Sequence, residues 1–171
     1  MVQYTGDNPK VKLQIETPGE TTYTYLLSQD KIFETFPLSG GNGTYSFTVL
    51  ENVEGDMYSV AFEHETEVQI EDEFLPFLYP NQYVSFTSDS AAVAKGSELS
   101  GNVHSDLEAI TNIYHFVTQN IVYDSERAAS VAYGYLPDID ETLSTKKGIC
   151  FDYAALTAAM LRSQRIPTRL E

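Results

Sequence analysis

The first half of the chain alternates apolar and polar residues with a period of two. In residues 10–16, for example, the apolar side chains Val11, Leu13 and Ile15 fall on one face. Short alternating segments separated by glycine, proline, asparagine and aspartate predict antiparallel strands, and their number favours a sandwich of two sheets. The predicted strands cover residues 10–16, 22–28, 31–36, 44–50 and 58–70.

The last of these predicted strands, residues 58–70, is the longest alternating segment. Read as one uninterrupted strand, it places Tyr58, Val60, Phe62 and His64 on one face and three glutamates on the other. Because an alternating strand buries its apolar face, we expect His64 to point inward and to have its hydrogen bonds satisfied there.

The hydrophobic period changes to that of helices after residue 88. Residues 105–120 begin with Ser105 and Glu108 at the spacing of a capping box, and apolar residues then recur at steps of three and four. Residues 150–163 are small or apolar on most sides, which predicts a helix buried in the core. The apolar stripe of the first helix, which we expect to face the core, consists of Leu107, Ile110, Tyr114 and Val117.

Residues 133–148, between the two predicted helices, are interpreted as an irregular loop. Pro137 and the acidic residues Asp138, Asp140 and Glu141 that follow it argue against regular structure in this segment.

The chain is acidic, with a formal net charge of −15 from 10 basic and 25 acidic residues. Such a field repels phosphates, so we expect neither nucleic acid nor an anionic membrane as a partner. No apolar run approaches the roughly 20 residues that span a bilayer, so we expect no membrane insertion. The sequence from His64 to Val68 begins like a zinc-protease motif but lacks the second histidine. We therefore expect no metal site and no other cofactor.

Cys150 is the only cysteine, which excludes an intramolecular disulfide and leaves two interpretations open. A free cysteine is commonly a small, buried packing residue. Cys150, however, follows Gly148 at a predicted helix start, in the one locally basic stretch, close to Lys146 and Lys147. The positive end of a helix and neighbouring cations lower the pKa of a thiol, so this position favours a nucleophile.

Three segments, in order along the chain, resemble motifs of the transglutaminase-like superfamily. Residues 146–170 resemble its nucleophile segment, with Gly-x-Cys before a buried helix and Ile-Pro-Thr-Arg after it, and residues 113–124 and 134–143 resemble two upstream motifs. The resemblance implies a papain-like core with a Cys-His-Asp triad. In such a core Cys150 would attack an amide of a protein or peptide substrate, followed by acyl transfer or hydrolysis.

The resemblance also implies supporting residues. Asp152 and Tyr153 match the family motif after the cysteine, and we expect Asp152 to orient the helix start by hydrogen bonding, not to transfer protons. The backbone N–H of Cys150 would supply one oxyanion donor. Tyr114 and Tyr123 are candidates for the second donor, although packing in the core is the favoured role for each.

The family's histidine and aspartate lie beyond the Ile-Pro-Thr-Arg segment, where this chain stops. His104 precedes a helix and is expected to be exposed, and His115 stays open as an alternative base because chain order alone does not forbid a triad. We therefore expect a truncated piece of a longer enzyme. It should be inactive by itself and able to self-associate through the uncovered side of the Cys150 helix.

The expected fold class is α+β. Residues 1–87 are predicted to form an N-terminal antiparallel, immunoglobulin-like β-sandwich, and residues 88–171 the helical half of a papain-like transglutaminase core. The first half resembles the sandwich that precedes this core in secreted or surface-anchored bacterial members. That resemblance implies an extracellular or cell-surface location, with the signal segment absent from this sequence.

A second hypothesis is a non-catalytic binding or adhesion module. In that case the sandwich would bind a glycan or a protein, and a degenerate core would act as a scaffold. A histidine and then an aspartate on strands beyond Arg169 would favour the enzyme, and their absence would favour the module.

Overall fold

The computed structural model describes residues 1–170. The chain forms two compact units, Met1–Pro76 and Phe77 to the C-terminus. The sequence pattern places the division later, at residues 87 and 88. The intervening segment belongs to the second unit because Val84, which is fully buried, lies in that unit's hydrophobic core. Whether the two units are independent domains stays a prediction.

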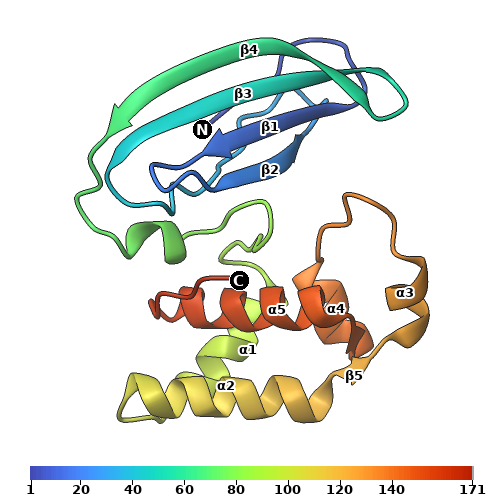
Figure 1. Cartoon of the computed structure of the whole chain (residues 1–171). Coiled ribbons are helices and arrows are strands. Elements are labelled where there is room, and N and C mark those ends of the chain that lie inside the picture. The colour runs from blue at the N-terminus through green and yellow to red at the C-terminus, as the bar shows by residue number, and fades with distance from the viewer. Residues whose placement is uncertain (171) are drawn as a thin grey trace. The chain divides into compact units, whose positions relative to one another are not determined.

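The first unit is built on one antiparallel sheet of four strands, in the order β2-β1-β3-β4 (Figure 1). The alternating segments of the sequence account for all four strands. The expected immunoglobulin-like sandwich is not confirmed, because the described residues of this unit form only this one sheet, whereas the mixed α+β class is confirmed. The strands are β1 (Val11–Glu16), β2 (Thr22–Leu27), β3 (Gly43–Glu54) and β4 (Met57–Val68).

The predicted strand at residues 31–36 is wrong, since this segment forms only an isolated bridge between Glu34 and Val2. Lys31 has a positive φ of 54°, and Pro37 lacks the N–H that a sheet needs, so few consecutive residues remain free to pair. The apolar face of the sheet, which includes the fully buried Tyr45, is therefore flanked by irregular segments and not by a second sheet.

A β-bulge in β4 corrects the prediction that residues 58–70 present a single apolar face. Val49 of β3 lies opposite Phe62, but its neighbour Leu50 lies opposite Val60, so Ala61 is an extra residue. Tyr58 and Val60 therefore lie on the opposite face of the sheet from Phe62 and His64, because each one-residue shift reverses the side-chain direction.

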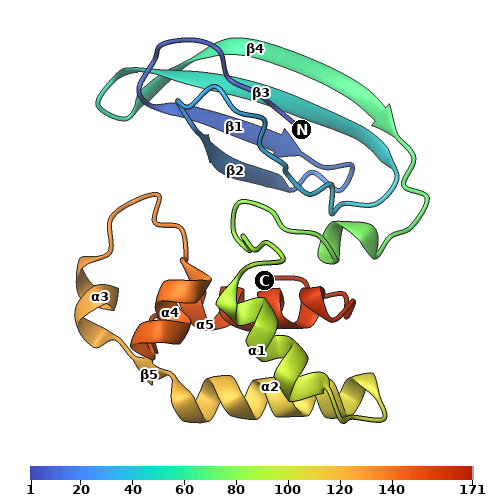
Figure 2. The ribbon, with the colours of Figure 1, turned by 180° about the vertical axis from the view of Figure 1, so that it is seen from behind.

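The second unit is helical, with a two-stranded parallel ribbon. The predicted helix at residues 150–163 is confirmed as α5, which packs against α1, α2 and α4 (Figure 2). No helix within residues 1–170 is long and apolar enough to cross a membrane. The elements are the short η1 (Leu75–Phe77) at the division of the units, α1 (Ala91–Ser100), α2 (Asp106–Asn120), β5 (Val122–Tyr123), α3 (Ser125–Ser130), α4 (Ile139–Thr145), β6 (Lys147–Gly148) and α5 (Cys150–Ser163).

Helix α2 begins at the predicted N-cap, where the Ser105 hydroxyl accepts a hydrogen bond from the Glu108 N–H. Its predicted core face is wrong for Leu107, Ile110 and Tyr114, which are 71%, 37% and 58% exposed, and confirmed for Val117, which is buried. The helix carries a second apolar stripe, which includes the small residue Ala109. A small side chain lets the helix axis approach the rest of the core more closely. The buried members of that second stripe are Ala109, Ile113 and Val117.

The predicted irregular loop over residues 133–148 is also wrong in part, since it contains α4 and β6. The acids that argued against regular structure start the helix instead. The Asp138 carboxylate accepts hydrogen bonds from the N–H groups of Asp140 (3.0 Å) and Glu141 (2.9 Å). Acidic side chains at a helix N-terminus also interact favourably with the helix dipole.

Candidate active site at the start of helix α5

The chain before Cys150 is fixed by the β5–β6 ribbon. The Val122 N–H donates to the Lys146 carbonyl (2.8 Å), and the Asp124 N–H donates to the Gly148 carbonyl (2.9 Å). Cys150 is then the first residue of α5, as predicted. The ribbon therefore holds the thiol at a defined point, where the helix N-terminus is positive.

The Cys150 side chain is exposed. Exposure does not fit the interpretation as a buried packing residue, and it leaves the sulfur open to a substrate. The next residue, Phe151, is half-buried. Its ring and that of Tyr83 form an edge-to-face pair with centroids 5.7 Å apart. Lys146 and Lys147 are exposed, so salt screens their influence on the thiol.

Asp152 lies one turn into α5 and is fully buried. One carboxylate oxygen accepts a hydrogen bond from the Ile149 N–H (2.8 Å), and the other accepts one from the Tyr135 hydroxyl (2.6 Å). The expected hydrogen bond between Asp152 and the helix start is therefore present. It satisfies one of the backbone donors that a helix N-terminus leaves free.

Arg127 and Glu141 extend this interaction. Arg127 Nη1 donates to the Tyr135 hydroxyl (3.1 Å) and lies 4.0 Å from an Asp152 oxygen, while Arg127 Nη2 donates to Glu141 (2.9 Å). The hydrogen bonds from Arg127 to Glu141 and Tyr135 raise the pKa of Arg127. Burial, followed by the hydrogen bond to Asp152, raises the pKa of Tyr135 to about 12. Below we call Arg127, Tyr135, Glu141 and Asp152 the Asp152 cluster.

Sequence reasoning missed three members of this cluster. Tyr135 and Glu141 lie in the segment 134–143, which resembles a family motif but was interpreted as a loop. Arg127 is the only basic residue between Lys95 and Lys146, and an isolated cation among acids is a signal that could have marked it.

The tyrosines divide into one structural residue and two exposed ones. The Tyr153 hydroxyl donates to the Ile121 carbonyl, and burial raises the pKa of Tyr153. Tyr123 lies in β5 opposite Gly148, with its ring 6.5 Å from that of Tyr153. Tyr114 lies on α2 and has no described contact with the start of α5. Both Tyr114 and Tyr123 are more than half exposed, so the favoured role in core packing is wrong for each.

The structure gives Cys150 no histidine partner within the described residues. His104 is exposed, as expected, and His115 is exposed on α2, where its ring meets the edge of Tyr114. His64 belongs to the first unit and is exposed, so the expectation of an inward-facing histidine with satisfied hydrogen bonds is wrong. Residues 1–170 contain no group of three or more His, Cys, Asp or Glu side chains arranged to hold a metal ion.

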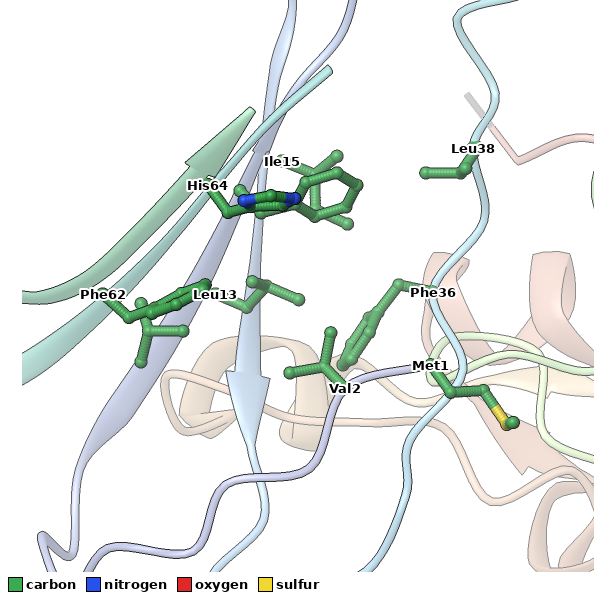
Figure 3. Close-up of a pocket in the computed structure, with 10 residues that line it drawn as sticks. Met1, Val2, Leu13, Ile15, Phe36, Leu38, Phe62 and His64 are labelled. Atoms are coloured by element: carbon green, nitrogen blue, oxygen red, sulfur yellow. The ribbon is translucent and has the colours of Figure 1, made fainter. Parts of the chain in front are cut away.

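The first unit contains a cavity of about 310 Å³ on the apolar face of its sheet (Figure 3). His64 is the only ionisable side chain among the residues that line it, and its ring stacks with that of Phe62 at a distance of 6.3 Å. The other walls are apolar and include Leu13, Ile15, Phe36 and Leu38.

Three proteins or families are similar to this chain, and the family match lies in the second unit. A family model described as a transglutaminase-like domain matches residues 88–169. A UPF0252 protein from Methanocaldococcus jannaschii is 39% identical over 62 residues, which cover 33% of this chain and 18% of that protein. The matched part of the chain thus spans less than a fifth of that relative.

A crystal structure of a candidate cysteine protease from Cytophaga hutchinsonii is also similar. The match covers 97% of this chain and 67% of that one, with 17% identity and a TM-score of 0.48. This likeness is too low to bear on chemistry.

Proposed function

Because a transglutaminase-like family model matches residues 88–169, we propose that the whole protein is a thiol enzyme that acts on amide bonds through Cys150. The observation that carries this proposal is the exposed thiol of Cys150 on the first residue of a 14-residue helix. Helix N-termini favour thiolates, and the thiolate is the nucleophilic form of cysteine.

In the proposed reaction the thiolate attacks the carbonyl carbon of an amide in a protein or peptide. A C–S bond forms, the C–N bond breaks, and the amine leaves with a proton. A second amine or water then attacks the acyl-enzyme, which releases the thiol. The backbone N–H of Cys150 is free of described hydrogen bonds and supplies one donor to the oxyanion.

The leaving amine needs a proton donor, and a positioned acid or base is worth about 10²–10⁴-fold in rate. Since no described histidine is bonded to Cys150, we propose that the histidine and the aspartate of the triad come from outside residues 1–170. This chain by itself is accordingly expected to be inactive. As part of the same proposal, we place the enzyme outside the cell or on its surface, as the resemblance implies.

The test compares this chain, the longer protein that contains it and the Cys150→Ala variant of the longer protein. Hydrolysis of peptide amides and incorporation of a labelled amine are measured for each. We expect turnover by the longer protein only, with at least a 10³-fold loss in the variant. Equal turnover with and without Cys150 would contradict the proposal, and Cys150-dependent turnover by this chain would contradict the missing base.

A binding module is the second candidate function, and the cavity of the first unit favours it. Ligand sites commonly have volumes of about 300–1,000 Å³ and apolar walls with few polar groups. This cavity has that size and character, with His64 as its one ionisable group. An apolar group of a protein partner fits such walls better than a glycan. This candidate would be favoured if the longer protein shows no turnover and if its Cys150→Ala variant still binds a protein partner.

A further inference from the structure

The Asp152 cluster bears on the chemistry of the thiol because Asp152 and Cys150 lie on the same first turn of α5. Asp152 is two residues from Cys150, on the first turn of the same helix, and is 0% exposed. A buried carboxylate near a sulfur disfavours the thiolate, since two like charges in a poorly solvated site repel each other. The helix that favours a thiolate at Cys150 therefore also carries a group that opposes it.

Arg127 supplies the compensating positive charge. Its Nη1 lies 4.0 Å from an Asp152 oxygen and donates to the Tyr135 hydroxyl, which in turn donates to Asp152. Glu141 binds the other side of the guanidinium, which fixes its orientation. The bond from the Ile149 N–H caps the helix, and the two further partners compensate the charge of the buried carboxylate.

Gly148 shows that the local backbone makes room for the carboxylate. A Cβ atom at this position would lie 2.7 Å from the Asp152 Cβ and 3.1 Å from one of its oxygens. Gly148 is thus packed directly against Asp152, and a larger residue at this position would displace the Asp152 side chain.

We propose that Arg127 and Tyr135 are positioning residues for the Cys150 thiolate, acting through the Asp152 carboxylate. Arg127 offsets part of the negative charge of Asp152, because it also pairs with Glu141, and Tyr135 links Arg127 to Asp152. Asp152 therefore opposes the thiolate less than it would without Arg127. This inference rests on the proposed function of Cys150 as a nucleophile. The other charged or titratable groups near this end of α5 are Lys146 and Lys147 on the preceding segment, Tyr123 and Asp124 at β5, Asp138 and Asp140 at α4, Tyr83 beside Phe151, and Tyr153 on α5 itself.

The test measures the rate of Cys150 alkylation by iodoacetamide between pH 5 and pH 10. The reaction is specific because the chain has one cysteine. Arg127→Met is expected to raise the pH midpoint by about one unit, so that alkylation at a fixed pH below the midpoint is about tenfold slower. Arg127→Lys should restore most of the midpoint because it restores the charge, and Tyr135→Phe should shift it less than Arg127→Met.

Arg165→Met is the matched control, because it removes the same charge beyond the far end of α5. That end is about 20 Å from Cys150, farther than the screening length of about 8–10 Å. We expect no shift for this variant. If Arg127→Met does not fold, Arg127→Gln, which keeps an amide donor for Tyr135, takes its place.

The outcomes separate this inference from the proposed function. A low midpoint in the wild type that Arg127→Met leaves unchanged overturns the positioning role but not the nucleophile. An equal shift from Arg165→Met also overturns it, because the effect would then belong to net charge. A wild-type midpoint at the free-cysteine value of about 8.5, unmoved by every variant, counts against both.

Discussion

At the scale of single residues, the first turn of α5 depends on contacts that are close in space but not in sequence. Cys150 and Asp152 are neighbours in one motif, so both could be predicted from the sequence. Tyr135 reaches Asp152 across 17 residues of chain, and its partner Arg127 lies in another helix. No local pattern specifies that pairing, because it depends on how α3, α4 and α5 pack.

The Tyr135 hydroxyl gives the Asp152 cluster a measurable pH dependence. Burial, followed by the hydrogen bond to Asp152, raises the pKa of this hydroxyl to about 12 from its usual value of about 10. A group whose pKa is raised in the folded state stabilises fully below its unfolded pKa, and the stabilisation is lost as the pH rises through the folded value. The Tyr135 contribution should therefore be complete at pH 9 and decline between about pH 10 and pH 12.

Tyr135→Phe tests this dependence. We expect the variant to lose about 1.5–3 kcal/mol of unfolding free energy at pH 8, because a buried carboxylate loses a hydrogen-bond donor. Urea unfolding at pH 8, 9, 10 and 11 should show that the difference between wild type and variant shrinks above pH 10. Tyr114→Phe, at an exposed tyrosine, serves as the control and should run parallel to the wild type. A constant difference for Tyr135→Phe would contradict the argument.

At the scale of elements, α1 approaches α5 through small residues. Ala92 and Gly96, one turn apart, are the buried residues of α1. A Cβ added at Gly96 would lie 3.1 Å from the carbonyl oxygen of Met160 and 3.2 Å from its Cα. The buried backbone of α5 therefore sets the closest approach of the two helices.

Gly96→Ala is expected to destabilise the protein by about 1 kcal/mol. Alanine gains about 1 kcal/mol of helix propensity over glycine, but overpacking costs roughly 1–3 kcal/mol, and the Met160 backbone has little freedom to move. Ala94→Gly at an exposed position of the same helix measures the propensity alone and should cost about 1 kcal/mol. Thermal or urea unfolding of both variants checks the comparison, and greater stability of Gly96→Ala would refute it.

The sequence predicted elements well where one pattern had one structural meaning. α5 and the four strands of the sheet fall in this class, although the bulge in β4 divides the apolar residues of that strand between two faces. α2 was placed correctly but rotated, since Leu107 and Ile113 belong to two stripes that only the neighbouring helices distinguish. α4 was missed because acids that disfavour a helix interior favour its start, and the position of that start is not visible before the cap is known.

At the scale of the whole molecule, the two units differ in how much of their structure could be predicted from the sequence. Alternation predicted β1 to β4 but could not show that Ala61 would be bulged, since a bulge depends on the register with β3. It also could not show that one sheet would form in place of two. The period change at residue 88 marked the first helix, whereas the core of the second unit begins earlier, with Val84 and the carbonyls of Phe77 and Tyr79.

Those two carbonyls argue for the position of the division. The Thr168 N–H donates to the Phe77 carbonyl (2.9 Å), and the buried Arg162 donates to the Tyr79 carbonyl (2.8 Å). Burial lowers the pKa of Arg162 to about 10, so its bonds to carbonyl oxygens compensate for desolvation. The segment from Phe77 onward is thus fastened to α5 and its C-terminal extension, whereas Glu71, Glu73 and Phe74 are exposed.

Limited proteolysis of the chain should therefore cut before residue 77 and spare residues 77–90. Chymotrypsin is expected to cleave first after Phe74, and Glu-specific protease after Glu71 or Glu73, because exposed backbone without such bonds opens most easily. Mass spectrometry of the first stable C-terminal fragment identifies the cut. A fragment that starts after Phe86 would instead support a division at residues 87 and 88. Substituting Arg162 with Met should make the connector more open, and chymotrypsin should then reach Phe77 and Phe86 at early times.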